Sequence, residues 1–279
     1  EALQEIQIIR GASSLQYGTQ FGGLVNFLIK KPNINKKLDV ISRNTVGSND
    51  LFTNFTSFSG NLHPISYYSF INYKKGSGFR PNSDFESKNI YSFLEWSLTP
   101  SIKFSTEVTY LDYLAQQAGG LTDEMFYQNP DQSNRSRNWF EVNWLLYNFK
   151  IRHNIDINTT YTFNVFGLDA SRYALGFRSN RVGQIDPLNE RDLIKGNFNN
   201  IGTEFKLLHN YKLFKKDVVS LVGYKLYKSD NISEQGPGSD SYGADFTFAY
   251  NEYPYYLNQS RYNYPNTNIA VFSESIFYL

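Results

Sequence analysis

The chain has 279 residues, enough for one large β domain or two smaller ones, and its formal net charge of +1 gives no reason to expect a nucleic-acid partner. Apolar residues make up 41% and charged residues 19% of the sequence, which excludes a disordered chain. The absence of Cys excludes disulfides, thiolate zinc sites and Cys nucleophiles. The sequence contains no run of 18 apolar residues, so it predicts no transmembrane helix. The opening EALQEIQ does not have the pattern of a signal peptide.

The first segment, 6–32, differs from the rest of the chain. Its sequence, IQIIRGASSLQYGTQFGGLVNFLIKKP, contains two apolar β-like runs separated by small residues, a Tyr-Gly pair and a double Gly. Ser13 or Ser14 can cap a short helical turn, and the glycines permit tight backbone turns. The segment ends in Lys-Lys-Pro, after which the pattern of the sequence changes.

Beyond residue 32 the sequence predicts a succession of strands with one apolar and one polar face. Apolar and polar residues alternate with a period of two in 102–110, 159–166 and 201–207. These segments are about ten residues long or slightly longer, the length that a tilted strand needs to cross a bilayer. We expect the apolar members of the pattern to face lipid: Phe104, Val108, Tyr161, Phe163, Ile201 and Phe205.

Short and long connections alternate along the predicted strands. The short ones lie near 61–66, 97–103, 151–158 and 212–219, and the long polar ones lie near 75–87, 114–141, 169–199 and 229–266. This asymmetry is typical of outer-membrane barrels, which have short periplasmic turns and long external loops. Aromatic residues near the strand ends are consistent with interface girdles: Tyr67, Tyr68, Tyr73, Tyr91, Trp96, Tyr110 and Tyr113. A soluble β-sandwich or β-helix is the alternative, although a sandwich rarely needs four loops of this length.

The opening segment closely resembles the end of the plug domain of TonB-dependent outer-membrane receptors. The resemblance is carried by an apolar strand, Arg-Gly, small residues, Tyr17-Gly18, Gly22-Gly23, an apolar-Asn-apolar strand and the exit at Pro32. It implies an all-β fold, in which 1–32 is the end of the plug domain and 33–279 is the N-terminal part of an antiparallel transmembrane β-barrel. About ten strands of a 22-stranded barrel are expected here, so the chain is expected to be a fragment.

Within that family, the chain most resembles the ferric dicitrate receptor branch, through YGTQFGGLVNFLIKKP and the loop beginning AGGLTDEMF. The resemblance implies that external-loop arginines and a Gln at the plug apex contact the chelate. It assigns these roles to Gln20, Arg172, Arg191 and Arg261, with Arg178 and Arg181 as additional candidates. Arg side chains suit carboxylates because the guanidinium can donate two parallel hydrogen bonds.

The function that the resemblance implies is energised import of a ferric chelate, ferric dicitrate, across the bacterial outer membrane. The expected partners are the TonB complex, whose contact segment would lie outside this chain, the chelate, and outer-membrane lipid and lipopolysaccharide. No cofactor is expected, and the iron would be held by its chelator. Another siderophore, haem, cobalamin or a glycan is an alternative cargo, and a passive porin or adhesin is an alternative of a different class.

Signals for catalysis or metal binding are weak. The carboxylate pairs at Asp123 and Glu124, and at Asp186 and Glu190, lie in predicted polar loops, where acids are usually solvated. The three His residues lie near predicted turns without metal-ligand spacing, and the Gly-rich run 234–243 lacks the Lys of a phosphate-binding loop. We therefore expect no enzyme activity.

Overall fold

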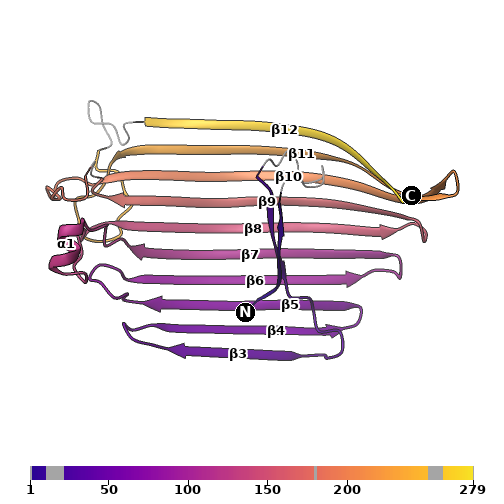
Figure 1. Ribbon diagram of the computed structural model, residues 1–279, viewed down its shortest axis with the longest axis horizontal. Coiled ribbons are helices and arrows are strands. Elements are labelled where there is room, and N and C mark those ends of the chain that lie inside the picture. The colour runs from indigo at the N-terminus through magenta and orange to yellow at the C-terminus, as the bar shows by residue number, and fades with distance from the viewer. Residues whose placement is uncertain (1, 11–21, 179–180, 251–259, 279) are drawn as a thin grey trace.

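The structure, a computed structural model, describes residues 2–10, 22–178, 181–250 and 260–278. Ten antiparallel strands form one sheet in which each strand pairs with its neighbours in sequence (Figure 1). The strands are β3 (Asp39–Val46), β4 (Phe52–Leu62), β5 (Ile65–Gly76), β6 (Phe85–Ser97), β7 (Ile102–Gln116), β8 (Trp139–Asn154), β9 (Thr159–Gly176), β10 (Asp192–Leu213), β11 (Lys216–Pro237) and β12 (Ser260–Phe277). The predicted antiparallel barrel wall of about ten strands is confirmed.

The strands are longer than the sequence predicts. β10 and β11 each have 22 residues, and the connection between β9 and β10 is confined to 177–191 instead of the predicted 169–199. The polar residues at these strand ends hide the alternation, although their backbones remain paired. One end of the sheet carries the short turns. The opposite end, called the loop end, carries the long connections and the helix α1 (Asp123–Gln128).

A separate two-stranded sheet crosses one face of the main sheet (Figure 1). It consists of β1 (Leu3–Ile9) and β2 (Leu24–Ile29). Ala2 and Ile29, at one end of this small sheet, pack against a buried aromatic cluster of Phe55, Tyr68, Phe70 and Tyr91. We call the face that bears this cluster the inner face. The prediction that Tyr68, Tyr91 and Tyr113 belong to an interface girdle is wrong. Tyr68 and Tyr91 lie inside this cluster, and register places Tyr113 on the same inner face.

The opposite, outer face is apolar over the half nearest the short turns. Phe104, Ile151, Phe163 and Phe205 oppose one another across β7 to β10, so continuous register places them on one face. By the same register, all six residues predicted to face lipid share this face. In β10 the apolar part extends from Leu207 to Ile201, roughly 20 Å of strand. Because the strands of membrane barrels are tilted by about 35–45°, this part covers roughly 15 Å of their ~25 Å apolar height.

Helices contribute little to the described part of the chain. α1 begins after Thr122, whose Oγ1 accepts a hydrogen bond from the Met125 backbone N–H at 3.2 Å. The sequence analysis did not predict this helix, which lies in the connection between β7 and β8. Among the described residues, no helix is both long and apolar enough to span a membrane.

Candidate functional site

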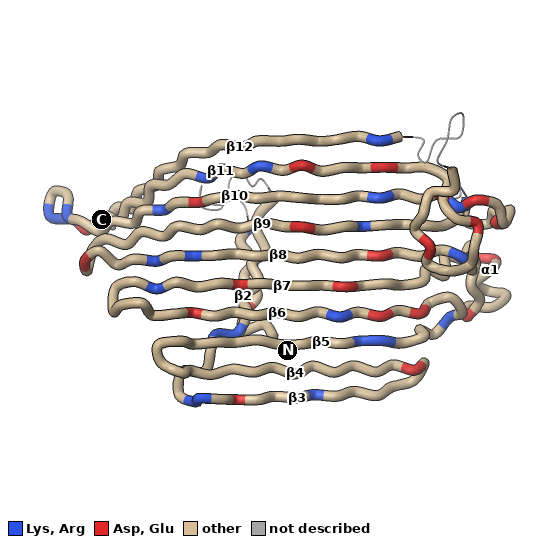
Figure 2. The backbone as a smooth tube through the Cα atoms, turned by 180° about the vertical axis from the view of Figure 1, so that it is seen from behind, with Lys and Arg blue, Asp and Glu red and all other residues tan. Residues whose placement is uncertain are grey.

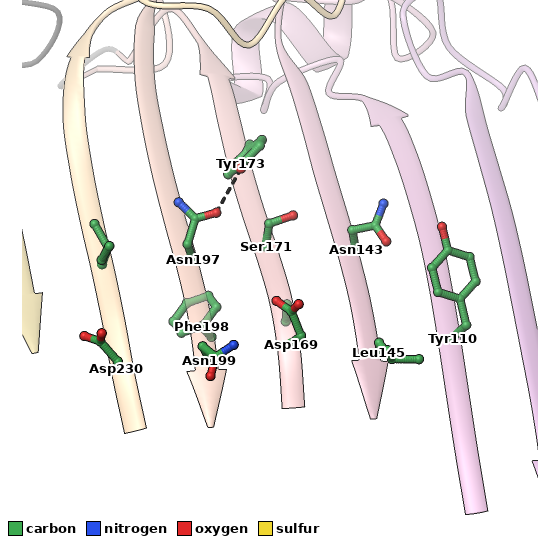
Figure 3. A pocket seen from close by; sticks show the side chains of 12 residues that line it. Tyr110, Asn143, Leu145, Asp169, Ser171, Tyr173, Asn197, Phe198, Asn199 and Asp230 are labelled. Atoms are coloured by element: carbon green, nitrogen blue, oxygen red, sulfur yellow. Dashed lines mark hydrogen bonds between the residues drawn. The ribbon is translucent and has the colours of Figure 1, made fainter. Parts of the chain in front are cut away.

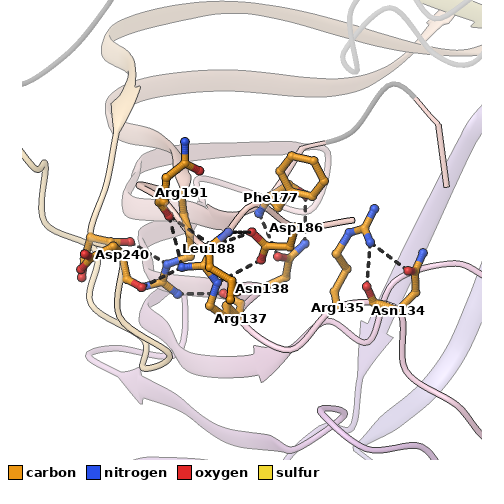
Figure 4. A network of polar contacts seen from close by, with 11 residues as sticks. Asn134, Arg135, Arg137, Asn138, Phe177, Asp186, Leu188, Arg191 and Asp240 are labelled. Atoms are coloured by element: carbon orange, nitrogen blue, oxygen red, sulfur yellow. Dashed lines mark hydrogen bonds and ion pairs between the residues drawn. The ribbon is translucent and has the colours of Figure 1, made fainter. Parts of the chain in front are cut away.

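Buried arginines tie the connections together at the loop end of the sheet (Figure 4). Arg137 precedes β8 and is 1% exposed. Its Nη2 and Nε donate to the two carboxylate oxygens of Asp186, at 2.6 and 3.0 Å, and its Nη1 donates to the Asp240 carbonyl at 2.7 Å. Two parallel bonds to a carboxylate fix direction as well as distance. One side chain therefore joins the start of β8 to the β9–β10 and β11–β12 connections.

Arg191, a predicted ligand residue, belongs to the same network. Its side chain is 1% exposed. Its Nε donates to the Ser239 carbonyl at 2.7 Å, its Nη1 to the Arg137 carbonyl at 2.7 Å, and its Nη2 to Ser241 Oγ at 3.1 Å. Burial, followed by the nearby charge of Arg137, lowers the pKa of Arg191. The Arg191 guanidinium therefore holds the β11–β12 connection against the residues that precede β8.

Arg135 is a third buried Arg at the loop end, and it links the residues before β8 to the β9–β10 connection. It is 6% exposed, and its guanidinium lies 5.1 Å from the ring centroid of Phe177. Its Nη2 donates to the Val182 carbonyl at 3.3 Å. Sequence reasoning did not single out Arg135 or Arg137. The available signal was the polar, Arg-bearing run SNRSRNW at 133–139, which leads into an aromatic strand.

Arg172, the second predicted ligand residue, lies on the inner face near the loop end. In register it opposes Val142 on β8 and Gly196 on β10, and the same row continues through Tyr113 on β7. Its side chain is exposed. Within the described residues it makes no side-chain hydrogen bond or ion pair, so its donors are available to a ligand.

The next row toward the short turns contains buried polar atoms that lack partners. Asn89 Oδ1, Trp144 Nε1 and Asn231 Oδ1 have no hydrogen-bond partner among the described residues. Register places all three on the inner face, in the row adjacent to that of Arg172. Buried polar groups are usually satisfied, so atoms of this kind point to a missing neighbour. We call Arg172, Asn89, Trp144 and Asn231 the inner-wall site.

Arg261 lies apart from these residues. Register places it on the outer face, opposite Glu234, and its Nη1 is 3.3 Å from Glu234 Oε1. Arg172, Arg191 and Arg261 therefore occupy the inner face, the loop interior and the outer face, and the structure does not bring them together. Arg178 and Arg181 are exposed at the β9–β10 connection. Gln20 lies outside the described residues.

Comparison with solved structures shows the fold. The chain aligns with the unliganded ferric citrate transporter FecA at a TM-score of 0.77 and 15% identity, covering 97% of this chain and 40% of that one. It aligns with the ferric-catecholate import receptor Fiu of E. coli at a TM-score of 0.73 and 11% identity, covering 99% and 47%. The corresponding values for the ferripyoverdine receptor of the outer membrane of Pseudomonas aeruginosa are 0.74, 12%, 98% and 39%.

The chain thus spans less than half the length of these solved structures. No family model matches its sequence, and no curated protein matches it. The wall fold is that of the outer-membrane siderophore receptors, and its apolar outer band is suited to the lipid of that membrane.

Proposed function

We propose that this chain is part of a TonB-dependent receptor that imports a ferric chelate, namely ferric dicitrate, into the periplasm. The observation that carries the proposal is the exposed Arg172 guanidinium, unpaired within the described residues, on the inner face of a wall with the siderophore-receptor fold. The resemblance of 6–32 to the end of a plug domain supports the same function, because a passive porin or an adhesin has no use for a plug.

The inner-wall site suits an anionic chelate. Arg172 can donate two hydrogen bonds to a carboxylate, and Trp144 Nε1 on the neighbouring strand can donate one more. Asn89 and Asn231 lie on β6 and β11, about 24 Å apart across five strand spacings, so a single chelate contacts one of them at most. In this proposal Gln20 contacts the chelate from the plug apex, and Arg178 and Arg181 are further contacts from the β9–β10 connection. The iron stays with its chelator, and no covalent step is required.

Arg191 and Arg261 are proposed to act differently from Arg172. Since Arg191 is hydrogen-bonded inside the loop cluster, we expect it to affect binding by holding the loops in place. Arg261 could contact a chelate bound at the inner face only if the edge of the sheet rearranged, because its side chain starts on the outer face. Work for transport would come from the TonB complex acting on the plug.

Calorimetry on the intact receptor tests the proposal. Wild type should bind ferric dicitrate, and Arg172→Ala should bind about 30-fold more weakly, equivalent to about 2 kcal/mol. Lys212→Ala is the control, because it also removes one positive charge but lies at the short-turn end of the sheet. This variant should bind ferric dicitrate as wild type does. Tight binding of a neutral siderophore or glycan, with none of ferric dicitrate, would show a different cargo.

A further inference from the structure

A cavity opens on the inner face of the wall, at the end nearest the short turns. It has a volume of about 530 Å³ and is lined by residues of β6, β7 and β8 and by Lys31, which follows β2. Among the described residues that line it, only Glu95 is acidic, whereas four are basic: Lys31, Lys103, Lys150 and Arg152. We call it the basic cavity.

Strand register brings the three cations of the wall together. Lys103 on β7 opposes Arg152 on β8, and Lys150 lies two residues away on the same face of β8. Neighbouring strands are about 5 Å apart, and alternate residues of one strand are about 7 Å apart, so the three side chains start within about 10 Å of one another. Figure 2 shows basic residues on β7 and β8 in this half of the sheet. An anion in the cavity can therefore contact more than one cation.

Most of this positive charge is not neutralised by the described part of the chain. Lys103 Nζ lies 2.7 Å from Glu95 Oε1. Within the described residues, the side chains of Lys31, Lys150 and Arg152 make no hydrogen bond or ion pair. Lys31 and Arg152 are exposed, and Lys150 is half-buried. Ammonium and guanidinium groups in this state are suited to carboxylates, which accept charge-assisted hydrogen bonds from them.

The origin of Lys31 indicates that an anion belongs in the cavity. Lys31 lies in the segment that resembles the end of a plug, whereas Lys150 and Arg152 belong to the wall. Like charges that line one cavity repel one another unless an anion lies between them. Cations from the segment and from the wall therefore form a binding site for an anion, and not a direct contact between the two.

The outer face of the wall carries a cavity of the same volume but of opposite charge (Figure 3). It lies over β7 to β11 and is lined by Asp169 and Asp230, with no Lys or Arg among its described lining residues. An anion is repelled there and attracted to the basic cavity. The distribution of charge thus favours an anion on the inner face.

We propose that the basic cavity is a second site for the anionic chelate, which occupies it before leaving for the periplasm. The chelate is the cargo of the proposed function, on which this inference rests. Arg152 lies ten residues along β8 from Val142, the neighbour of Arg172, so the two sites are about 30 Å apart on one face. Short turns of such barrels are periplasmic. Carboxylates of ferric dicitrate accept hydrogen bonds from Lys150 and Arg152, and Lys31 donates from the plug-like segment.

Equilibrium dialysis of the intact receptor against ferric dicitrate with labelled iron tests the proposal. Wild type should show two classes of site, and Lys150→Ala/Arg152→Ala should weaken one of them about tenfold, because two charge-assisted hydrogen bonds are lost from side chains that are exposed or half-buried. Arg172→Ala should weaken the other class and leave this one unchanged. Lys88→Ala/Lys228→Ala is the control, since it removes two cations from the outer face, and it should bind as wild type does.

Iron-free citrate is a separate probe of the basic cavity. It should raise the melting temperature of Arg172→Ala, because an anion that binds only the folded state stabilises it, and it should not raise that of Lys150→Ala/Arg152→Ala. Stabilisation by citrate without any binding of ferric dicitrate would reject the proposed cargo and keep the anion site, so the two proposals can fail separately.

Three results would overturn the second site. One is a single class of site in wild type, and another is an equal loss of affinity in the control variant. The third is a lower melting temperature of Lys150→Ala/Arg152→Ala together with no effect of citrate on wild type. That result would show that Lys150 and Arg152 pair with acidic side chains of the plug instead of an anion.

Discussion

At the scale of single residues, burial separates arginines that hold the loops from an arginine that can bind a ligand. Arg137 and Arg191 are each 1% exposed and are hydrogen-bonded on several sides, whereas Arg172 is exposed and unpaired within the described residues. The sequence presents all three as arginines in or near polar loops. It could not separate them, because the partners of Arg191 come from residues about 50 positions away.

Replacing Arg137 should open the loop cluster. Arg137→Met removes one partner of a buried ion pair and leaves the Asp186 carboxylate uncompensated, which typically costs about 3–5 kcal/mol. Hydrogen exchange of 181–191 and 238–249 should accelerate accordingly. Arg261→Met is the control, since its ion pair with Glu234 is mostly exposed on the Arg side and should contribute less than about 1 kcal/mol. Equal protection in both variants would contradict the role of Arg137.

The same ion pair predicts how the loops respond to acid. Burial acts to raise the pKa of Asp186, but hydrogen bonds from Arg137 and the Leu188 backbone N–H outweigh it and lower the pKa below its ordinary value. A carboxylate with a lowered folded pKa stabilises the fold above its unfolded pKa, and the stabilisation is lost as pH falls through the folded value.

Loop protection should therefore persist at pH values down to about 4, near the ordinary pKa of an aspartate, and decline only below that. Limited proteolysis across pH, with Asp186→Asn for comparison, measures this. In Asp186→Asn the protection should be weaker at neutral pH and should change less on acidification. Loss of wild-type protection already between pH 7 and 5 would argue against the ion pair as the cause.

At the scale of elements, the period of two predicted the faces of the strands well. Phe104, Phe163 and Phe205 share the outer face as expected, because alternation in a strand is fixed by backbone geometry. Strand length was predicted less well. Beyond the apolar band the outer face becomes polar, whereas the inner face carries apolar residues such as Phe198. The alternation therefore reverses, and Asp169 and Asn199 read as loop residues although their backbones are paired. The contact of Gln20 with the chelate and the boundary between plug and barrel after residue 32 stay predictions.

Spin labels can test the orientation of the strands in a bilayer. The chain has no Cys, so single Cys residues can be introduced without background. Labels replacing Phe163 and Phe205 should be accessible to oxygen and protected from a polar nickel reagent. Labels at Thr162 and Lys206, which pair in register on the inner face, should show lower oxygen access. The same accessibility at all four sites would contradict the assignment of an outer and an inner face.

At the scale of the whole molecule, the sheet is open in the described chain. β3 and β12 each pair with one neighbour, and the solved structures with this fold are more than twice as long. Acidic and basic residues gather in the connections at the loop end, around α1 (Figure 2). The apolar outer band suits a membrane, but the unpaired strand edges of the described sheet are not suited to lipid.

This open sheet predicts the behaviour of the 279-residue chain expressed alone. Its unpaired edges should pair with other copies, so the chain should form large assemblies in detergent, whereas the intact receptor should be monodisperse. Light scattering after size-exclusion chromatography distinguishes the two. A monodisperse monomer of the 279-residue chain would show that these strands close without further ones.

Iron uptake by cells tests the proposal that the wall belongs to an energised importer of an anionic ferric chelate. Cells that carry the intact receptor as their only route for ferric dicitrate should accumulate labelled iron, and uptake should stop when the TonB complex is deleted. Arg172→Ala should lower uptake at limiting chelate, whereas Lys212→Ala should not. Undiminished uptake without the TonB complex would contradict the account, because it would show a passive pore.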